Sequence, residues 1–270
     1  SVEDILATRS LTRTVLSVMA TELGRRQPDL SRVAELVSVA TRPWLEAAGS
    51  RAVHVRAMDL RSAHAESLLA TEPSLAELPS LKAPLGPIEL LRAQISGLAD
   101  AADAVGHAGP LCMAVRHVTD PREVELLARL SAEFDDRVSV RPYADAPRAL
   151  LLEPRPDAGG VFWLDFDSLQ AAMFGISPTE LETPEPLDTH VAAGLYEVDP
   201  RTGVDRSMGM LLDRLAEALP DASGIVGVRF TSPVSDAIVR DLYDRGVRAF
   251  SINPPDLLPL RLAVGKAATA

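Results

Sequence analysis

Apolar residues follow two different spacings along this chain, and segments with one spacing alternate with segments with the other. Short apolar runs typical of β-strands lie at residues 51–59, 111–116, 138–144, 161–166, 224–230 and 247–252. Between the runs, apolar residues recur at helical spacing, over 30–48, 88–105, 120–134, 205–219, 234–243 and 254–267. The segment 146–152 is long enough for one more helix. Strands that alternate with helices in this way predict an α/β fold with a parallel sheet.

Proline and glycine punctuate the pattern. Pro121 predicts the first turn of a helix, and Gly246 predicts a helix end, because glycine readily takes the left-handed conformation there. Proline-rich stretches at 72–87 and 175–195 are predicted to be irregular, since proline removes a backbone donor and fixes φ.

The length of the chain bounds its organisation. It has 270 residues, without a linker-like boundary or a short tandem repeat, so we predict a single domain over 1–270. This length and the repeated strand–helix alternation favour an eight-fold β/α barrel. An open, doubly wound parallel sheet is the alternative fold.

Acidic residues follow two neighbouring strands of this pattern. Asp145 directly follows the run at 138–144, while Asp165 lies at the end of the run at 161–166 and Asp167 directly follows it. Parallel strands joined by a helix bring their carboxyl ends to one edge of the sheet, where α/β enzymes hold substrates and metals. The alternative is structural, because acidic residues also cap the helices that follow strands.

Composition narrows the class of partner and the compartment. The net charge is −11 and the chain has no basic block, which argues against nucleic acid or an anionic membrane as the main partner. No apolar run reaches the length of a membrane span, and the N-terminus lacks the basic region of a signal peptide. The single cysteine, Cys112, excludes a disulfide framework, so we expect a cytoplasmic protein with a buried Cys112.

Four segments carry a further pattern, at residues 11–14 (LTRT), 53–59 (VHVRAMD), 90–98 (LLRAQISGL) and 227–254. In this order they resemble the phosphoenolpyruvate/pyruvate-binding barrel. Phosphoenolpyruvate synthase, pyruvate phosphate dikinase and enzyme I of the sugar phosphotransferase system share that barrel. The resemblance covers nearly the whole chain and implies a (β/α)8 barrel that binds a small anionic substrate.

The resemblance also assigns residues. Arg13 and Arg56 match the arginines that hold the phosphate of phosphoenolpyruvate in that family. Asp145 matches its magnesium-binding glutamate. Its magnesium-binding aspartate falls on Ser168, so that ligand is lost unless Asp167 or Asp165 substitutes from a neighbouring position. The resemblance therefore implies a Mg²⁺ ion at Asp145 and Asp167, and magnesium needs hard oxygen ligands of this kind.

Other positions depart from the family. Its catalytic cysteine has no counterpart in the turn at 229–233, and its phosphohistidine domain would have to be a separate partner. We therefore expect binding of a pyruvate-like 2-oxo acid or enol phosphate without autonomous phosphotransferase activity. If the chain is active, we expect a Mg²⁺-dependent transferase or a lyase. The alternative is a degenerate barrel that serves as a binding or assembly module. The resemblance to the family also implies a homodimer.

The predicted site gathers these residues at one rim. Arg56 lies inside an apolar strand, where a guanidinium is costly unless it is paired, so an anion or a carboxylate such as Asp59 must satisfy it. His54 lies two residues before Arg56 and shares its face of the strand, as an acid–base group or as a core histidine. We expect Arg56, Asp59, Asp145 and Asp167 to converge at the carboxyl-terminal rim, with Arg13 nearby.

Overall fold

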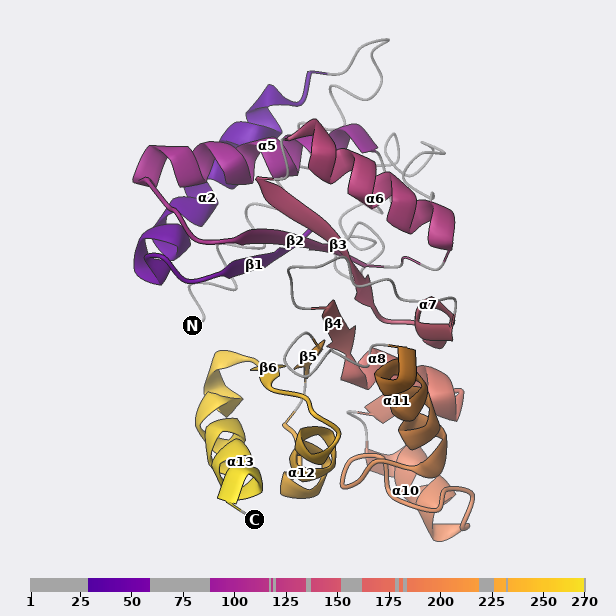
Figure 1. Ribbon diagram of the computed structural model, residues 1–270. Helices are drawn as coiled ribbons and strands as arrows, with labels where there is room; N and C mark the ends of the chain where they lie inside the picture. The colour runs from indigo at the N-terminus through magenta and orange to yellow at the C-terminus, as the bar shows by residue number, and fades with distance from the viewer. Residues whose placement is uncertain are drawn as a thin grey trace. The chain divides into compact units, whose positions relative to one another are not determined.

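A computed structural model describes residues 29–58, 88–116, 118, 120–134, 137–151, 162–177, 180–181, 184–218, 226–231 and 233–269 (Figure 1). The chain divides into two compact units, and each is described by itself below. The first unit comprises Ser1–Arg116 and Arg122–Arg141, and the second comprises His117–Pro121 and Pro142–Ala270. The single domain over 1–270 stays a prediction.

The described residues contain six strands, and each falls within one of the six predicted runs. They pair in the order β1-β2-β3-β4-β5-β6. Pairing is parallel from β1 to β2 and successively from β3 to β6. Their bounds are β1 (Val53–Arg56), β2 (Leu111–Val115), β3 (Val138–Ala144), β4 (Phe162–Asp165), β5 (Val226–Arg229) and β6 (Ala249–Ser251). The predicted α/β fold with a parallel sheet is therefore confirmed, while closure into an eight-stranded barrel stays a prediction.

Strand β3 belongs to both units. Its residues up to Arg141 lie in the first unit, and those from Pro142 onward lie in the second. Pro142 has no backbone N–H, so the strand lacks one ladder donor at this boundary.

Among the described residues, three helices accompany β1, β2 and the start of β3 in the first unit. They are α2 (Ser31–Ala48), α5 (Ile88–Val105) and α6 (Pro121–Glu133). Helices α5 and α6 lie over the same face of these strands, and α2 packs against α5 (Figure 1). All five residues of β2 are buried, as expected for a strand covered on both faces.

Two close contacts position the helices of this unit. Gly97 of α5 lies so close to α2 that an added Cβ would stand 2.3 Å from the carbonyl oxygen of Ala34. The buried hydroxyl of Ser131, on α6, donates to the carbonyl of Val138 at 3.1 Å and accepts from the N–H of Val140 at 2.7 Å. Helix α6 is thereby fixed to the start of β3.

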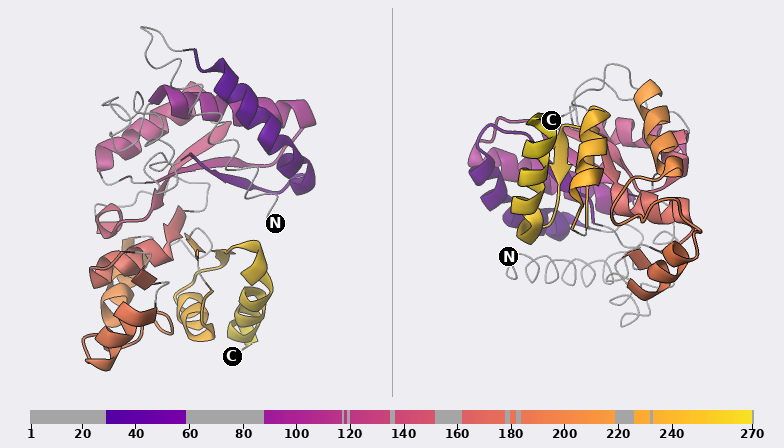
Figure 2. Two further views of the ribbon diagram at one scale, coloured as in Figure 1. Left: turned by 180° about the vertical axis from the view of Figure 1, so that it is seen from behind. Right: turned by 90° about the horizontal axis from the view of Figure 1, so that it is seen from below.

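The second unit has its own apolar core. Its helices are α7 (Pro147–Leu151), α8 (Phe166–Phe174), α10 (Pro184–Ala192), α11 (Arg206–Ala218), α12 (Asp236–Asp244) and α13 (Leu257–Thr269), with a 3₁₀ turn, η2 (Pro254–Asp256), before α13. Leu164 and Val228, from β4 and β5, pack in this core with side chains of α8, α11, α12 and α13. Helices α12 and α13 lie side by side (Figures 1 and 2).

Proline and glycine positions test the predicted boundaries. Pro121 begins α6, and Gly246 follows α12 with φ at 92°, as predicted. The prediction of an irregular segment over 175–195 is wrong, because α10 lies within it. Pro184 and Pro186 stand in the first turn of α10, where proline removes no helical hydrogen bond.

Candidate functional site

Two acidic residues lie at the carboxyl ends of neighbouring strands in the second unit. Strands β3 and β4 are in register at Ala144 and Leu164; Asp145 directly follows β3, and Asp165 is the last residue of β4. Their side chains are 8% and 1% exposed, respectively. The parallel pairing therefore produces the juxtaposition of Asp145 and Asp165 that the sequence predicts.

Arg229 joins this edge from the next strand. It ends β5 in register with Asp165, and its Nη1 lies 3.9 Å from Asp165 Oδ2. The Tyr143 hydroxyl donates to the same carboxylate oxygen at 3.2 Å. Because the neighbouring Leu164 and Val228 point into the apolar core, alternation places Asp165 and Arg229 on the opposite face of the sheet.

Asp165 also caps the helix that follows β4. Its Oδ1 accepts a hydrogen bond from the Ser168 N–H at 3.1 Å and so caps the N-terminus of α8. The structural role that the sequence offered as an alternative is therefore real for Asp165. One carboxylate thus caps α8 through Oδ1 and contacts Tyr143 and Arg229 through Oδ2.

The guanidinium of Arg229 is incompletely satisfied. Its Nη1 is buried and has no hydrogen-bond acceptor within the described residues, because 3.9 Å from Asp165 is too long for a hydrogen bond. A buried donor that makes no hydrogen bond costs about 1–3 kcal/mol, and more for a charged group. An anion bound at this edge would supply the acceptor.

Asp167 ties two loops of the site together. It is the second residue of α8, and its Oδ2 accepts hydrogen bonds from the Thr231 N–H at 2.6 Å and from the Thr231 hydroxyl. The side-chain amide of Asn253 donates to the Thr231 carbonyl at 2.7 Å. Asp167 thus holds the segment after β5 against α8.

These contacts bear on the predicted magnesium ion. One oxygen of Asp167 is already engaged by Thr231, so metal binding would compete with two hydrogen bonds. Within the part of the chain that is described, no three His, Cys, Asp or Glu residues gather as metal ligands. Mg²⁺ usually takes one or two carboxylates and keeps its waters, so an ion at Asp145 and Asp167 stays a prediction.

The first unit carries a separate group of polar residues on one strand face. Arg56 ends β1 with an exposed side chain, in register with Ala114 of β2, and His54 is in register with Cys112. Burial and the nearby Arg141 lower the pKa of His54, so its imidazole is neutral at pH 7. Burial raises the pKa of Cys112 to about 11, and Arg141 lowers it by less.

Cys112 is therefore a protonated core thiol, as the sequence predicts. His54 is equally poorly suited to hold a proton near pH 7, since both of its neighbouring influences favour the neutral ring. Of the two roles that the sequence leaves open for His54, the environment therefore favours the structural one, with a half-buried, neutral imidazole.

The predicted site residues fall into three groups. Arg13 and Asp59 lie outside the described residues. Arg56 belongs to the first unit, whereas Asp145 and Asp167 belong to the second. Their convergence at one rim stays a prediction.

Two comparisons with known proteins were negative. No protein-family model and no curated protein sequence matches the chain. None of the described helices combines the length and the hydrophobicity that a membrane crossing requires. The assignment to a function therefore rests on the site itself.

Sequence reasoning missed Tyr143 and Arg229. A signal for Arg229 was present, because it ends an apolar strand just as Arg56 does, and a guanidinium there needs a partner. Tyr143 gave no such signal, since a tyrosine is ordinary in a β-strand. Its role follows from the β3–β4 register, which the sequence does not specify.

Proposed function

We propose that this chain is a divergent (β/α)8 barrel of the phosphoenolpyruvate-utilising type that binds a pyruvate-like 2-oxo acid or enol phosphate. It does so without autonomous phosphotransferase activity. The parallel strand order and the polar residues at the carboxyl ends of β3, β4 and β5 support this proposal. Ligands of parallel α/β proteins bind at this edge.

The observation that carries the proposal is the buried Nη1 of Arg229, which has no hydrogen-bond acceptor among the described residues. A guanidinium presents donors in a planar fork that matches the oxygens of carboxylate and phosphate. The nearest oxygen of Asp165, Oδ2, lies 3.9 Å from Nη1, which is too far to accept a hydrogen bond from it. Arg56 and Arg13 remain the anion-binding residues that the family resemblance implies.

The degenerate binding or assembly module is the second candidate. It is favoured by the structural use of both carboxylates, since Asp165 caps α8 and Asp167 holds Thr231. The absence of a thiol from the turn at 229–233 points the same way, because removing one positioned proton donor typically costs about 10²–10⁴ in rate. A lyase of the same type needs no phosphohistidine partner and remains the enzymatic alternative.

A thermal-shift titration tests these readings. Phosphoenolpyruvate, pyruvate and oxalate are each added with and without Mg²⁺, and the midpoint of unfolding is measured. A ligand at about 100 times its Kd stabilises the folded state by roughly 2.7 kcal/mol. For a protein of this size, that corresponds to a rise on the order of 5–10 °C.

Matched variants locate the bound anion. Arg229→Met should abolish the rise, while Arg229→Lys, which keeps the charge, should retain part of it. Arg214→Met is the control, because Arg214 is 67% exposed on α11 and pairs only loosely with Glu217 at 3.4 Å. This control should leave the rise unchanged.

Each outcome decides something. A rise that requires Mg²⁺ supports the metal site at Asp145 and Asp167 and an enzymatic role. A rise without Mg²⁺ that disappears in Arg229→Met supports a bare anion site, and one that disappears only in Arg56→Ala moves the anion to Arg56. No rise with any of the three ligands overturns the proposal and leaves the binding module.

A further inference from the structure

The second unit contains a cavity of about 410 Å³ beside the ends of β4 and β5. This size lies at the lower end of the range for small-molecule sites, about 300–1,000 Å³. Much of its wall is apolar, including Phe166, Phe230 and Val234. The rings of Phe166 and Phe230 are in contact, with centroids 5.3 Å apart, so they form a rigid apolar surface.

The polar part of the wall presents acceptors. Gln170 is 3% exposed, and its Nε2 donates to the carbonyl oxygen of Pro200 at 2.7 Å. Because a carbonyl can only accept, this bond fixes the amide orientation and leaves Oε1 as an acceptor in the wall. Within the described residues, no donor reaches that oxygen. The carboxylate of Asp167, 8% exposed, adds a negative charge beside it.

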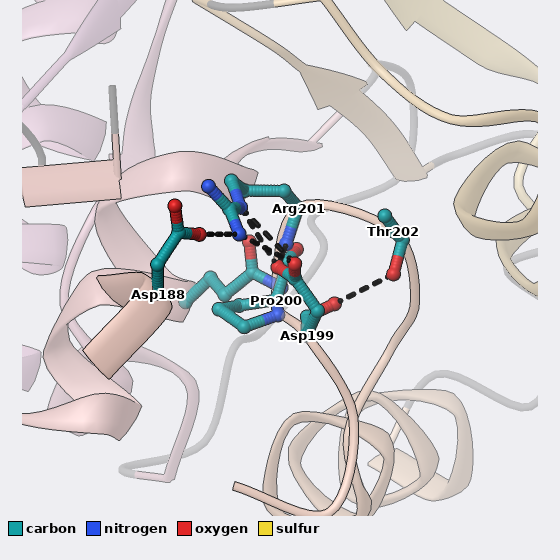
Figure 3. A network of polar contacts seen from close by, with 6 residues as sticks. Asp188, Asp199, Pro200, Arg201 and Thr202 are labelled. Carbon is teal, nitrogen blue, oxygen red and sulfur yellow. Dashed lines mark hydrogen bonds and ion pairs between the residues drawn. The ribbon is translucent and has the colours of Figure 1, made fainter. Parts of the chain in front are cut away.

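The one cationic residue of the wall, among those described, is already neutralised. Arg201 donates through Nε and Nη2 to both carboxylate oxygens of Asp199, at 2.7–3.2 Å, and through Nη2 to Asp188 at 2.5 Å (Figure 3). Hydrogen bonds from Arg201 lower the pKa of Asp199, so that carboxyl is ionised at pH 7. Two carboxylates thus pair with the guanidinium of Arg201, so its positive charge is already compensated, while Asp167 contributes a carboxylate to the cavity wall.

We propose that this cavity binds a small amine, with the apolar body of the ligand against Phe166 and Phe230 and its ammonium group toward Gln170 Oε1 and Asp167. An ammonium carries several N–H donors and no acceptor, which suits Gln170 Oε1 and the Asp167 carboxylate, since both can only accept. Hydrogen bonds to charged groups are also stronger than neutral ones. The cavity thus selects the opposite charge from the anion edge at Arg229.

Three probes with the same phenyl body test the proposal on the whole chain. They are 2-phenylethylamine, 2-phenylethanol and 3-phenylpropionate, titrated at pH 7 by isothermal calorimetry with ligand-observed NMR. We expect the amine to bind most tightly and the carboxylate most weakly. Asp167→Asn keeps an acceptor for Thr231 but removes the charge, so it should weaken amine binding by about tenfold or more. Binding of the alcohol should change far less.

Blocking variants place the ligand in the cavity. Val234→Phe adds a ring at the half-buried rim and should abolish binding of all three probes. Val39→Phe makes the same change on α2 of the first unit, where Val39 is 58% exposed, and should leave binding unchanged. Circular dichroism checks that both variants are folded.

Three results would overturn the proposal. They are no binding of the amine, binding of the carboxylate as tightly as the amine, and amine binding that survives in a folded Val234→Phe variant. These results leave the anion proposal untouched, because that proposal is tested with oxalate and the Arg229→Met variant and not with the amine.

Discussion

The close approach of α2 and α5 gives a stability prediction whose sign can be worked out. Alanine is the better helix former by about 0.8–1.0 kcal/mol, so Gly97→Ala in α5 should stabilise an unobstructed helix. Here the new Cβ would stand 2.3 Å from Ala34 O and 2.9 Å from Val37 Cβ. Ordinary van der Waals contact begins near 3.4 Å, and the nearest atom belongs to rigid backbone, so the helices must separate by about 1 Å.

Separation of two packed helices outweighs the gain in propensity. Overpacking of a core typically costs about 1–3 kcal/mol, and a backbone obstruction belongs in the upper part of that range. After the gain in helix propensity is subtracted, we expect Gly97→Ala to destabilise the first unit by about 1–2 kcal/mol. This corresponds to about a 5–30-fold larger population of the opened unit.

Cys112 supplies the assay. It is the single cysteine of the chain, it is buried in β2 of the same unit, and burial raises its thiol pKa to about 11. A thiol reagent at pH 8 should therefore react only when the unit opens, at a rate that follows the opened population. We expect Gly97→Ala to accelerate labelling of Cys112 by the same 5–30-fold, about one order of magnitude.

A second glycine provides the control. Gly265 of α13 has no atom within 4 Å of an added Cβ, so Gly265→Ala should bring the propensity gain without a clash. It lies in the second unit and should not accelerate labelling. If Gly97→Ala labels no faster than the parent chain, the argument from helix contact is wrong.

Two further predictions concern the first unit. Ser131→Ala leaves the N–H of Val140 and the carbonyl of Val138 without their buried partner, so urea denaturation should show a loss of about 1–3 kcal/mol. If Ser131→Ala unfolds at the parent midpoint, water satisfies those groups. Burial and Arg141 hold the pKa of His54 below its ordinary 6.5, so its contribution to stability is complete above about pH 6.5 and is lost as pH falls through the lowered pKa. His54→Gln should flatten the pH dependence of the unfolding free energy in this range, and an unchanged slope would contradict the assignment.

The sequence predicts elements more reliably than contacts. The run of five apolar residues in β2 and the helical spacing over 88–105 each demand one kind of structure, and both are as predicted. Helix α10 escaped prediction because Pro184 and Pro186 signal a break in a helix interior but not in its first turn. Local sequence signals predict an element correctly when they all agree. They mislead when, as for proline, the same residue breaks a helix in its interior but is tolerated in its first turn.

The candidate site depends on relations that sequence spacing leaves open. Acidic residues at two strand ends predicted a shared edge, and the register at Ala144 and Leu164 fulfils it for Asp145 and Asp165. That Asp165 also meets Tyr143 and Arg229 depends on how three strands align, to a single residue. The cavity depends on side chains from four separate segments and leaves no periodic trace in the sequence.

The proline within β3 affects how the two units unfold. A strand shared by two folded units normally transmits loss of structure from one to the other, because its backbone ladder is continuous. Pro142 interrupts that ladder where the division falls, so one link in the transmission is missing. Melting followed by two probes, one in each unit, should therefore be treated as two events until the curves superimpose. A single midpoint fitted to the whole chain would average the two.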